Sequence, residues 1–160
     1  MTGFGVIASE AKQFADLEAP VIIVHSLIQA IAALKAAVRA DRPVVLASPP
    51  GAGSYAGPGW FREVVAVARK AVPEARCSAL LDCGDDVGAA LAALRAEVEG
   101  VVFTGRADVT SRLADIARQQ GVRFSTEQPV VALDLGDDFF VSAEMVEQRC
   151  ADLLTRPGNG

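Results

Sequence analysis

The sequence has 160 residues, a length that suits one domain whose core folds without metal ions or disulfides. Its formal net charge is −5, and no basic stripe or arginine run occurs in it, which argues against a nucleic-acid partner. Hydrophobic residues make up 51% of the sequence, which indicates helices and strands packed in layers or a substantial subunit interface. We therefore expect a homodimer.

The cysteines and the N-terminal residues indicate the compartment. Cys77, Cys83 and Cys150 are odd in number and no two of them have CxxC spacing, so a reducing cytoplasm fits better than an oxidising compartment. The first 14 residues contain no basic start followed by an apolar core, as a signal peptide would. The apolar runs are too short to span a bilayer. We expect a cytoplasmic protein with no membrane partner.

Strand-like and helix-like segments alternate along the chain. The predicted strands are residues 21–24, 44–47, 78–81, 101–103, 122–124 and 130–133, and the predicted helices are residues 26–39, 60–71, 86–98, 108–120 and 142–154. The central strands are unbroken apolar runs, typical of parallel strands buried on both faces, and whole helices fill the connections. The pattern predicts one α/β domain, residues 1–155, with a mainly parallel five- to six-stranded sheet and flanking helices. A frayed tail, residues 156–160, is expected to follow.

The loop after the second strand, residues 49–59, is rich in glycine and leads into a helix. Glycine lets the backbone approach an anion, and a helix N-terminus offers N–H groups and a positive dipole end. The spacing matches a dinucleotide fingerprint only in part, because Gly57 comes one residue late, and a P-loop is excluded because no lysine follows the last glycine. The alternative is a long turn shaped by proline and glycine. The candidate ligand-binding residues here are Ser48, Gly51, Gly53, Ser54 and Tyr55.

The third strand runs into an acidic loop, Asp82-Cys83-Gly84-Asp85-Asp86. Parallel strands bring this loop and the glycine loop to the same sheet edge, where open α/β folds bind ligands. Asp82 is a candidate general acid or base. The alternative is a structural aspartate bonded to loop amides. Asp85 or Asp86 is most simply a helix N-cap.

Cys83 in the same loop is a candidate nucleophile. The helix N-terminus beside it would lower the pKa of its thiol, whereas three aspartates would raise it. The base would have to be His25, the one histidine of the sequence, for which the alternative is a packed or capping role. These ligands are too few for a zinc site, so we expect no metal and no cofactor.

The fourth strand ends in Thr104-Gly105-Arg106. Arg106 is a strand-end cation suited to a phosphate or carboxylate, and Thr104 lies beside it. The alternative is a salt bridge from Arg106 to Asp108 or to an aspartate of the neighbouring loop. Together with the glycine loop, these residues indicate a small anionic metabolite as the partner.

Residues 20–127 resemble the first half of the class II fructose-bisphosphate aldolase barrel. The motifs agree with the family in order and spacing: Pro43-Val44-Val45-Leu46, Gly51-Ala52-Gly53-Ser54-Tyr55, Leu81-Asp82-Cys83-Gly84 and Gly121-Val122. The resemblance implies that Asp82 has the proton-donor position, that Cys83 replaces a zinc-binding histidine, that Thr104 replaces an acidic residue and that Glu127 matches a fifth-strand glutamate. The other metal-binding histidines and the phosphate motifs belong to the second half of a barrel of roughly 250 residues. Aldolase activity is therefore not expected.

A half-barrel would expose the inner face of its sheet, and two architectures would cover it. In a flavodoxin-like sandwich, which we favour, residues 1–18 and 135–155 cover that face. In the alternative, half of a TIM barrel pairs with a second chain. Three functions stay open: binding of a small anionic metabolite at the strand C-terminal edge, a lyase or isomerase reaction with Asp82 as general acid or base, and a non-catalytic assembly or regulatory role.

Overall fold

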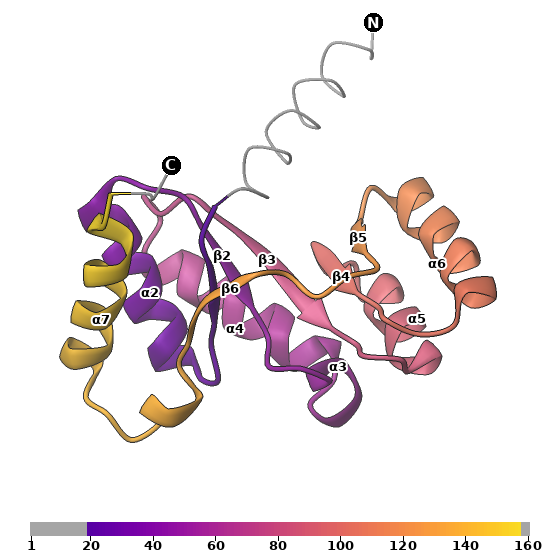
Figure 1. Cartoon of the computed structure of the whole chain (residues 1–160), viewed down its shortest axis with the longest axis horizontal. Coiled ribbons are helices and arrows are strands. Elements are labelled where there is room, and N and C mark those ends of the chain that lie inside the picture. Colours follow the sequence, from indigo (N-terminus) through magenta and orange to yellow (C-terminus); the bar gives the residue numbers. More distant parts are fainter. Residues whose placement is uncertain (1–18, 158–160) are drawn as a thin grey trace, which may run out of the picture.

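The computed structural model describes residues 19–157, and its centre is a six-stranded sheet (Figure 1). The strands follow the order β5-β4-β3-β2-β1-β6, and every neighbouring pair is parallel. Their bounds are β1 Val21–Ile23, β2 Val44–Ala47, β3 Cys77–Asp82, β4 Gly100–Val102, β5 Arg123–Ser125 and β6 Val131–Asp134. The predicted α/β class and the predicted parallel sheet are confirmed.

The helices also follow the predicted segments to within a few residues. Their bounds are α2 Leu27–Ala40, α3 Ala52–Tyr55, α4 Pro58–Ala71, α5 Val87–Arg95, α6 Ala107–Gln120 and α7 Ala143–Thr155, with a short 3-10 helix, η1, at Gly136–Asp138. α3 is a single turn inside the glycine loop, which was predicted as loop throughout. α4 begins two residues early because Pro58 has a φ angle already suited to a first helical turn. None of the helices within residues 19–157 is long and apolar enough to cross a bilayer.

The helices pack on one face of the sheet. Ile22 and Leu46 belong to one buried cluster with residues of α2, α4 and α7, and Leu81 and Val101 belong to a second cluster with residues of α4, α5 and α6. Alternate strand residues point to the opposite face, which we call the inner face. This face carries a separate apolar cluster of Ala19, Val21, Ile23, Val45, Ala47, Leu80 and Val102.

Residues 126–130, which we call the strap, cross the inner face and join β5 to β6 (Figure 1). These strands are the two edges of the sheet, and in a flat sheet five strand spacings would separate them by roughly 24 Å. From Ser125 to Val131 the chain can span only about 20–22 Å, and it must also return along the strand direction. The sheet is therefore curled, so that its edges approach each other.

The curl and the strand order correct the expectation of a flavodoxin-like sandwich. A flavodoxin-like sheet has the order 2-1-3-4-5 and helices on both faces. Here β1 to β5 are neighbours in sequence order, and β6 lies beside β1, where a closed barrel places its last strand. The strand order is that of the alternative, part of a barrel.

The inner face is covered by a different segment from those expected. Of residues 135–155, α7 packs on α2 in the helical layer, because the connection after β6 returns the chain to that side. Residues 1–18 lie outside the described residues. Within residues 19–157 the strap lies over part of this face, and the inner-face cluster is at most 7% exposed. The homodimer stays a prediction.

Replacing Gly100 of β4 by alanine should destabilise the protein. A Cβ atom there would lie 3.0 Å from the carbonyl oxygen of Ala79 and 2.5 Å from Leu80 Cδ2, so both the β3 backbone and the Leu80 side chain would have to shift. We expect a loss of about 1–3 kcal/mol in the free energy of unfolding, measured by urea unfolding. The control is Gly59→Ala, since nothing lies within 4 Å of that Cβ and alanine favours helix α4. Equal losses in the two variants would contradict this packing.

Candidate functional site

Asp82 is the last residue of β3, and its side chain lies on the inner face at the C-terminal end of the sheet. The residue is 5% exposed. Its Oδ1 accepts the backbone N–H groups of Gly51 at 3.0 Å and of Gly84 at 2.8 Å. Its Oδ2 accepts a side-chain N–H of Gln128 at 2.6 Å. The carboxylate therefore joins three segments: the glycine loop, the loop after β3 and the strap.

The local backbone is built to present these donors. Gly51 has a φ of 73° and Gly84 a φ of 57°, left-handed conformations that favour glycine and let both loops turn back onto the carboxylate. Ser48, buried after β2, accepts the N–H of Asp82 on its Oγ at 2.9 Å and donates to the carbonyl of Pro49 at 3.1 Å. The Ser48 hydroxyl, a predicted ligand group, is thus engaged in holding β3 beside the glycine loop.

The space in front of the Asp82 carboxylate is nearly filled. A cavity of about 10 Å³ remains, bordered by Gln128 and Pro129 of the strap. Such a volume is about the least that holds one water molecule. A substrate has no room beside the carboxylate while the strap lies there. The geometry is that of a structural aspartate bonded to loop amides.

The remaining residues of the glycine loop make contacts within the fold. Gly53 is buried against the end of β3, where a Cβ atom would lie 2.6 Å from Cys83 Sγ and 3.1 Å from the carbonyl oxygen of Asp82. Ser54 Oγ donates to Asp86 Oδ2 at 2.8 Å. Tyr55 is 69% exposed. Gly53 is therefore required for close packing.

The structure gives Cys83 and His25 separate partners. Cys83 is fully buried, and burial, with the Asp82 and Asp86 carboxylates, raises the pKa of its thiol to about 12. His25 Nε2 lies 2.8 Å from Asp134 Oδ1, at the ends of β1 and β6. A nucleophilic cysteine needs a lowered pKa and an adjacent base, and neither is found here. Among the described residues no three His, Cys, Asp or Glu side chains are grouped as metal ligands.

Arg106 forms a salt bridge with Asp108, which was one of the predicted alternatives. Its Nε and Nη2 donate to the Asp108 carboxylate at 3.1 and 2.7 Å, and its side chain is 80% exposed. Thr104 is also exposed, and its backbone N–H donates to the Gly84 carbonyl at 2.8 Å. Glu127 lies exposed in the strap, where its backbone N–H and C=O both bond to Ser125 Oγ.

Sequence reasoning missed Gln128, the strap residue that bonds to Asp82. The two residues are 46 positions apart, and no motif or periodic pattern surrounds Gln128. The signal available was the carboxylate itself, because a buried Asp82 requires donors.

Replacing Asp82 by alanine should lower the free energy of unfolding by roughly 2–4 kcal/mol, because two backbone N–H groups and one amide lose their acceptor. Denaturant unfolding followed by circular dichroism measures the loss. The matched control is Asp85→Ala in the same loop, whose side chain is exposed and whose loss should stay within about 0.5 kcal/mol. Similar losses for both would show that the buried carboxylate holds nothing in place.

Iodoacetamide at pH 8 should label Cys77 well before the other two cysteines of the native protein. Burial raises the pKa of Cys83 to about 12 and that of Cys150 to about 11, so thiolate is scarce at pH 8. Cys77 is partly exposed, and Arg69 Nε donates to its Sγ at 3.2 Å. Peptide mass spectrometry reports the order, and in denaturant all three should react at similar rates. Early labelling of Cys83 would count against its burial.

Comparison with known proteins places the fold. No family model and no curated protein sequence match the chain. Among solved structures, a Coccidioides immitis protein described as a fructose-1,6-bisphosphate aldolase matches at 19% identity and a TM-score of 0.57, over 72% of this chain and 42% of that one. The YdjI aldolase from Escherichia coli K12 matches at 17% identity and a TM-score of 0.55, over 71% of this chain and 46% of that one. A Sinorhizobium meliloti 1021 protein described as a tagatose 6-phosphate kinase matches at 16% identity and a TM-score of 0.51, over 85% of this chain and 45% of that one.

At these identities the likeness shows the fold alone. The chain spans less than half the length of each of these structures. The resemblance inferred from the motifs of residues 20–127, to the first half of an aldolase-like barrel, is confirmed at the level of the fold.

Proposed function

We propose that this chain is a non-catalytic protein that binds a small molecule carrying an anionic group. The observation that carries the proposal is the Asp82 carboxylate, whose hydrogen bonds all go to the fold and whose front is closed by the strap. A general acid or base must come within hydrogen-bond reach of the proton that it transfers. Asp82 has no room for that approach, so we assign it to the framework of the protein.

The other reactive candidates support the same proposal. The Cys83 thiol, with a pKa raised to about 12 by burial and two carboxylates, is a poor nucleophile at neutral pH. The His25 ring is bonded to Asp134 at the far edge of the sheet, on the β1 and β6 side. No pair of nucleophile and base is thus assembled from the predicted residues.

A binding role is favoured over an assembly role because the inner face holds a cavity of about 760 Å³, a size typical of small-molecule sites. The anion site expected between residues 51–59 and Arg106 is less favourable. Arg106 already holds Asp108, and the hydrogen bond from Thr104 to Gly84 brings the loop of Asp85 and Asp86 beside it. An incoming anion there would meet several carboxylates.

The proposal predicts that the purified chain, with or without added Zn²⁺, does not cleave fructose 1,6-bisphosphate above the buffer blank. Asp82→Asn, which keeps an acceptor for the loop N–H groups, should leave that result unchanged. A thermal-shift screen of carboxylates and phosphates should find at least one ligand. A coupled assay for triose phosphate, with a class II aldolase as positive control, gives the measurement. Cleavage that Asp82→Asn abolishes would overturn the proposal.

A further inference from the structure

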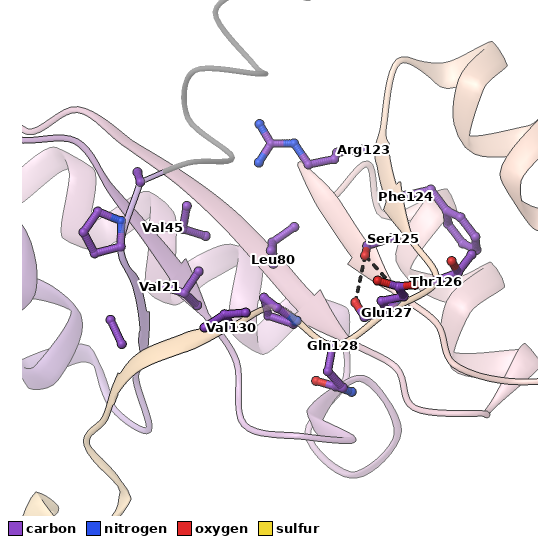
Figure 2. Close-up of a pocket in the computed structure, with 14 residues that line it drawn as sticks. Val21, Val45, Leu80, Arg123, Phe124, Ser125, Thr126, Glu127, Gln128 and Val130 are labelled. Carbon is purple, nitrogen blue, oxygen red and sulfur yellow. Dashed lines mark hydrogen bonds between the residues drawn. The ribbon is translucent and has the colours of Figure 1, made fainter. Parts of the chain in front are cut away.

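We infer that two copies of this chain form a two-fold dimer through the N-terminal ends of α2 and α7, with Phe140 of each copy in a groove of the other. These helix ends lie side by side in the helical layer (Figure 1). The surface, which we call the α2–α7 patch, carries four exposed apolar side chains: Ile28, Phe139, Phe140 and Met145. The cavity under the strap lies on the inner face, away from this patch, so the dimer leaves it open (Figure 2).

Phe139 and Phe140 form the tip of a turn. The backbone N–H of Val141 donates to the carbonyl of Asp138 at 3.0 Å, which leaves the two phenylalanines as the central residues of the turn. Turn centres favour glycine, proline, asparagine and aspartate for their backbone preferences, and phenylalanine offers none of these. Because Phe140 is exposed there, its ring is placed to enter a partner surface.

Contacts within the chain hold this turn in position. Asp138, at its start, is buried and accepts a hydrogen bond from the Arg149 guanidinium of α7. The Phe140 ring packs edge-on against the Phe139 ring, with 5.2 Å between the ring centres and 80° between the ring planes. Little conformational freedom is therefore lost when Phe140 is buried, which favours association.

A groove between α2 and α7 has room for the Phe140 ring. Its apolar lining includes Ile28, Ile31 and Ala143, all at least partly exposed, and its volume is about 220 Å³. An apolar cavity of about 150 Å³ is enough to bind benzene. Ring and groove lie on the same surface of one chain, and a two-fold axis between them brings each onto its complement in the second copy. The groove therefore fits Phe140 of an identical chain.

The charges at the rim of the groove also favour a second copy. Lys35 of α2 and Glu144 of α7 are exposed there, and neither has a salt-bridge partner within residues 19–157. Glu147, the third charged residue of the rim, is already paired with Arg39. In a two-fold contact Lys35 of one copy meets Glu144 of the other, and the reverse pair forms with it.

The exposed apolar area is sufficient for a specific dimer. Phe140 is 96% exposed, Met145 61%, Ile28 60% and Phe139 54%. At about 150–250 Å² for a large side chain, the four expose roughly 500 Å² in each copy. Two copies would bury about 1,000 Å², which is the least expected of a specific interface.

The test is sedimentation velocity of the full chain at concentrations from about 1 to about 200 µM, which bracket an expected dissociation constant of about 10 µM. We expect a species of twice the mass of one chain that dissociates on dilution. A monomer at every concentration would overturn the inference. Larger open assemblies would also overturn it, because they indicate a head-to-tail contact.

Phe140→Asp should weaken dimerisation at least about tenfold, since it removes the ring and would bury a charge. The matched control is Val67→Asp on α4, another exposed apolar position that lies outside the patch, and it should dimerise as the parent does. Circular dichroism checks that both variants are folded. A dimer unchanged by Phe140→Asp would overturn the inference.

Charge reversal tests the two-fold arrangement separately. Lys35→Glu and Glu144→Lys should each weaken the dimer at least about threefold, because each brings like charges together. The double variant should recover the affinity of the parent, since the pair is formed again with its signs exchanged. A role of either side chain in folding alone would give no such recovery. No loss in the single variants, or no recovery in the double variant, would overturn the two-fold arrangement.

Discussion

The hydrogen bonds of the Asp82 carboxylate are the contact on which the inner face depends. Through Gly51 and Gly84 it fixes the loops that follow β2 and β3, and through Gln128 it fixes the strap. Hydrogen bonds to an ionised acceptor are stronger than neutral ones, and at 5% exposure no bulk water replaces them. The glycine loop, the acidic loop and the strap therefore hold their positions together.

The strap in turn determines the shape of the sheet. Because the strap is only five residues long, it can join β5 to β6, the two edge strands, only if the sheet is curled. Pro129 adds stiffness, since its ring fixes φ and reduces the conformational freedom that folding must remove. The strap also lies over apolar strand residues that water would otherwise contact. Removing apolar surface from water stabilises the fold by about 25 cal/mol for each Å². Part of a barrel is thus closed by its own chain.

Local contacts were predictable from the sequence and distant ones were not. Asp86, one of the two residues predicted as the cap of α5, is the N-cap, because a cap bonds to an N–H three positions away, here that of Ala89. Ile28 of α2 is apolar, yet it is 60% exposed. Gln29 is buried instead, because its amide donates to the carbonyl of Leu135 at 2.8 Å. A partner 106 positions away leaves no periodic trace, and neither does Gln128 of the strap, 46 positions from Asp82.

The strap also decides where a ligand can lie. Open α/β sheets bind ligands at the C-terminal ends of their strands, and the motifs of this sequence gather there. The strap, however, runs from the C-terminal end of β5 to the N-terminal end of β6, leaving about 10 Å³ beside Asp82 and about 760 Å³ at the other end. At the strand ends the Arg106 guanidinium is bonded to Asp108. The open space on the inner face therefore follows the path of the strap, and the loops rich in motifs hold the strap through Asp82.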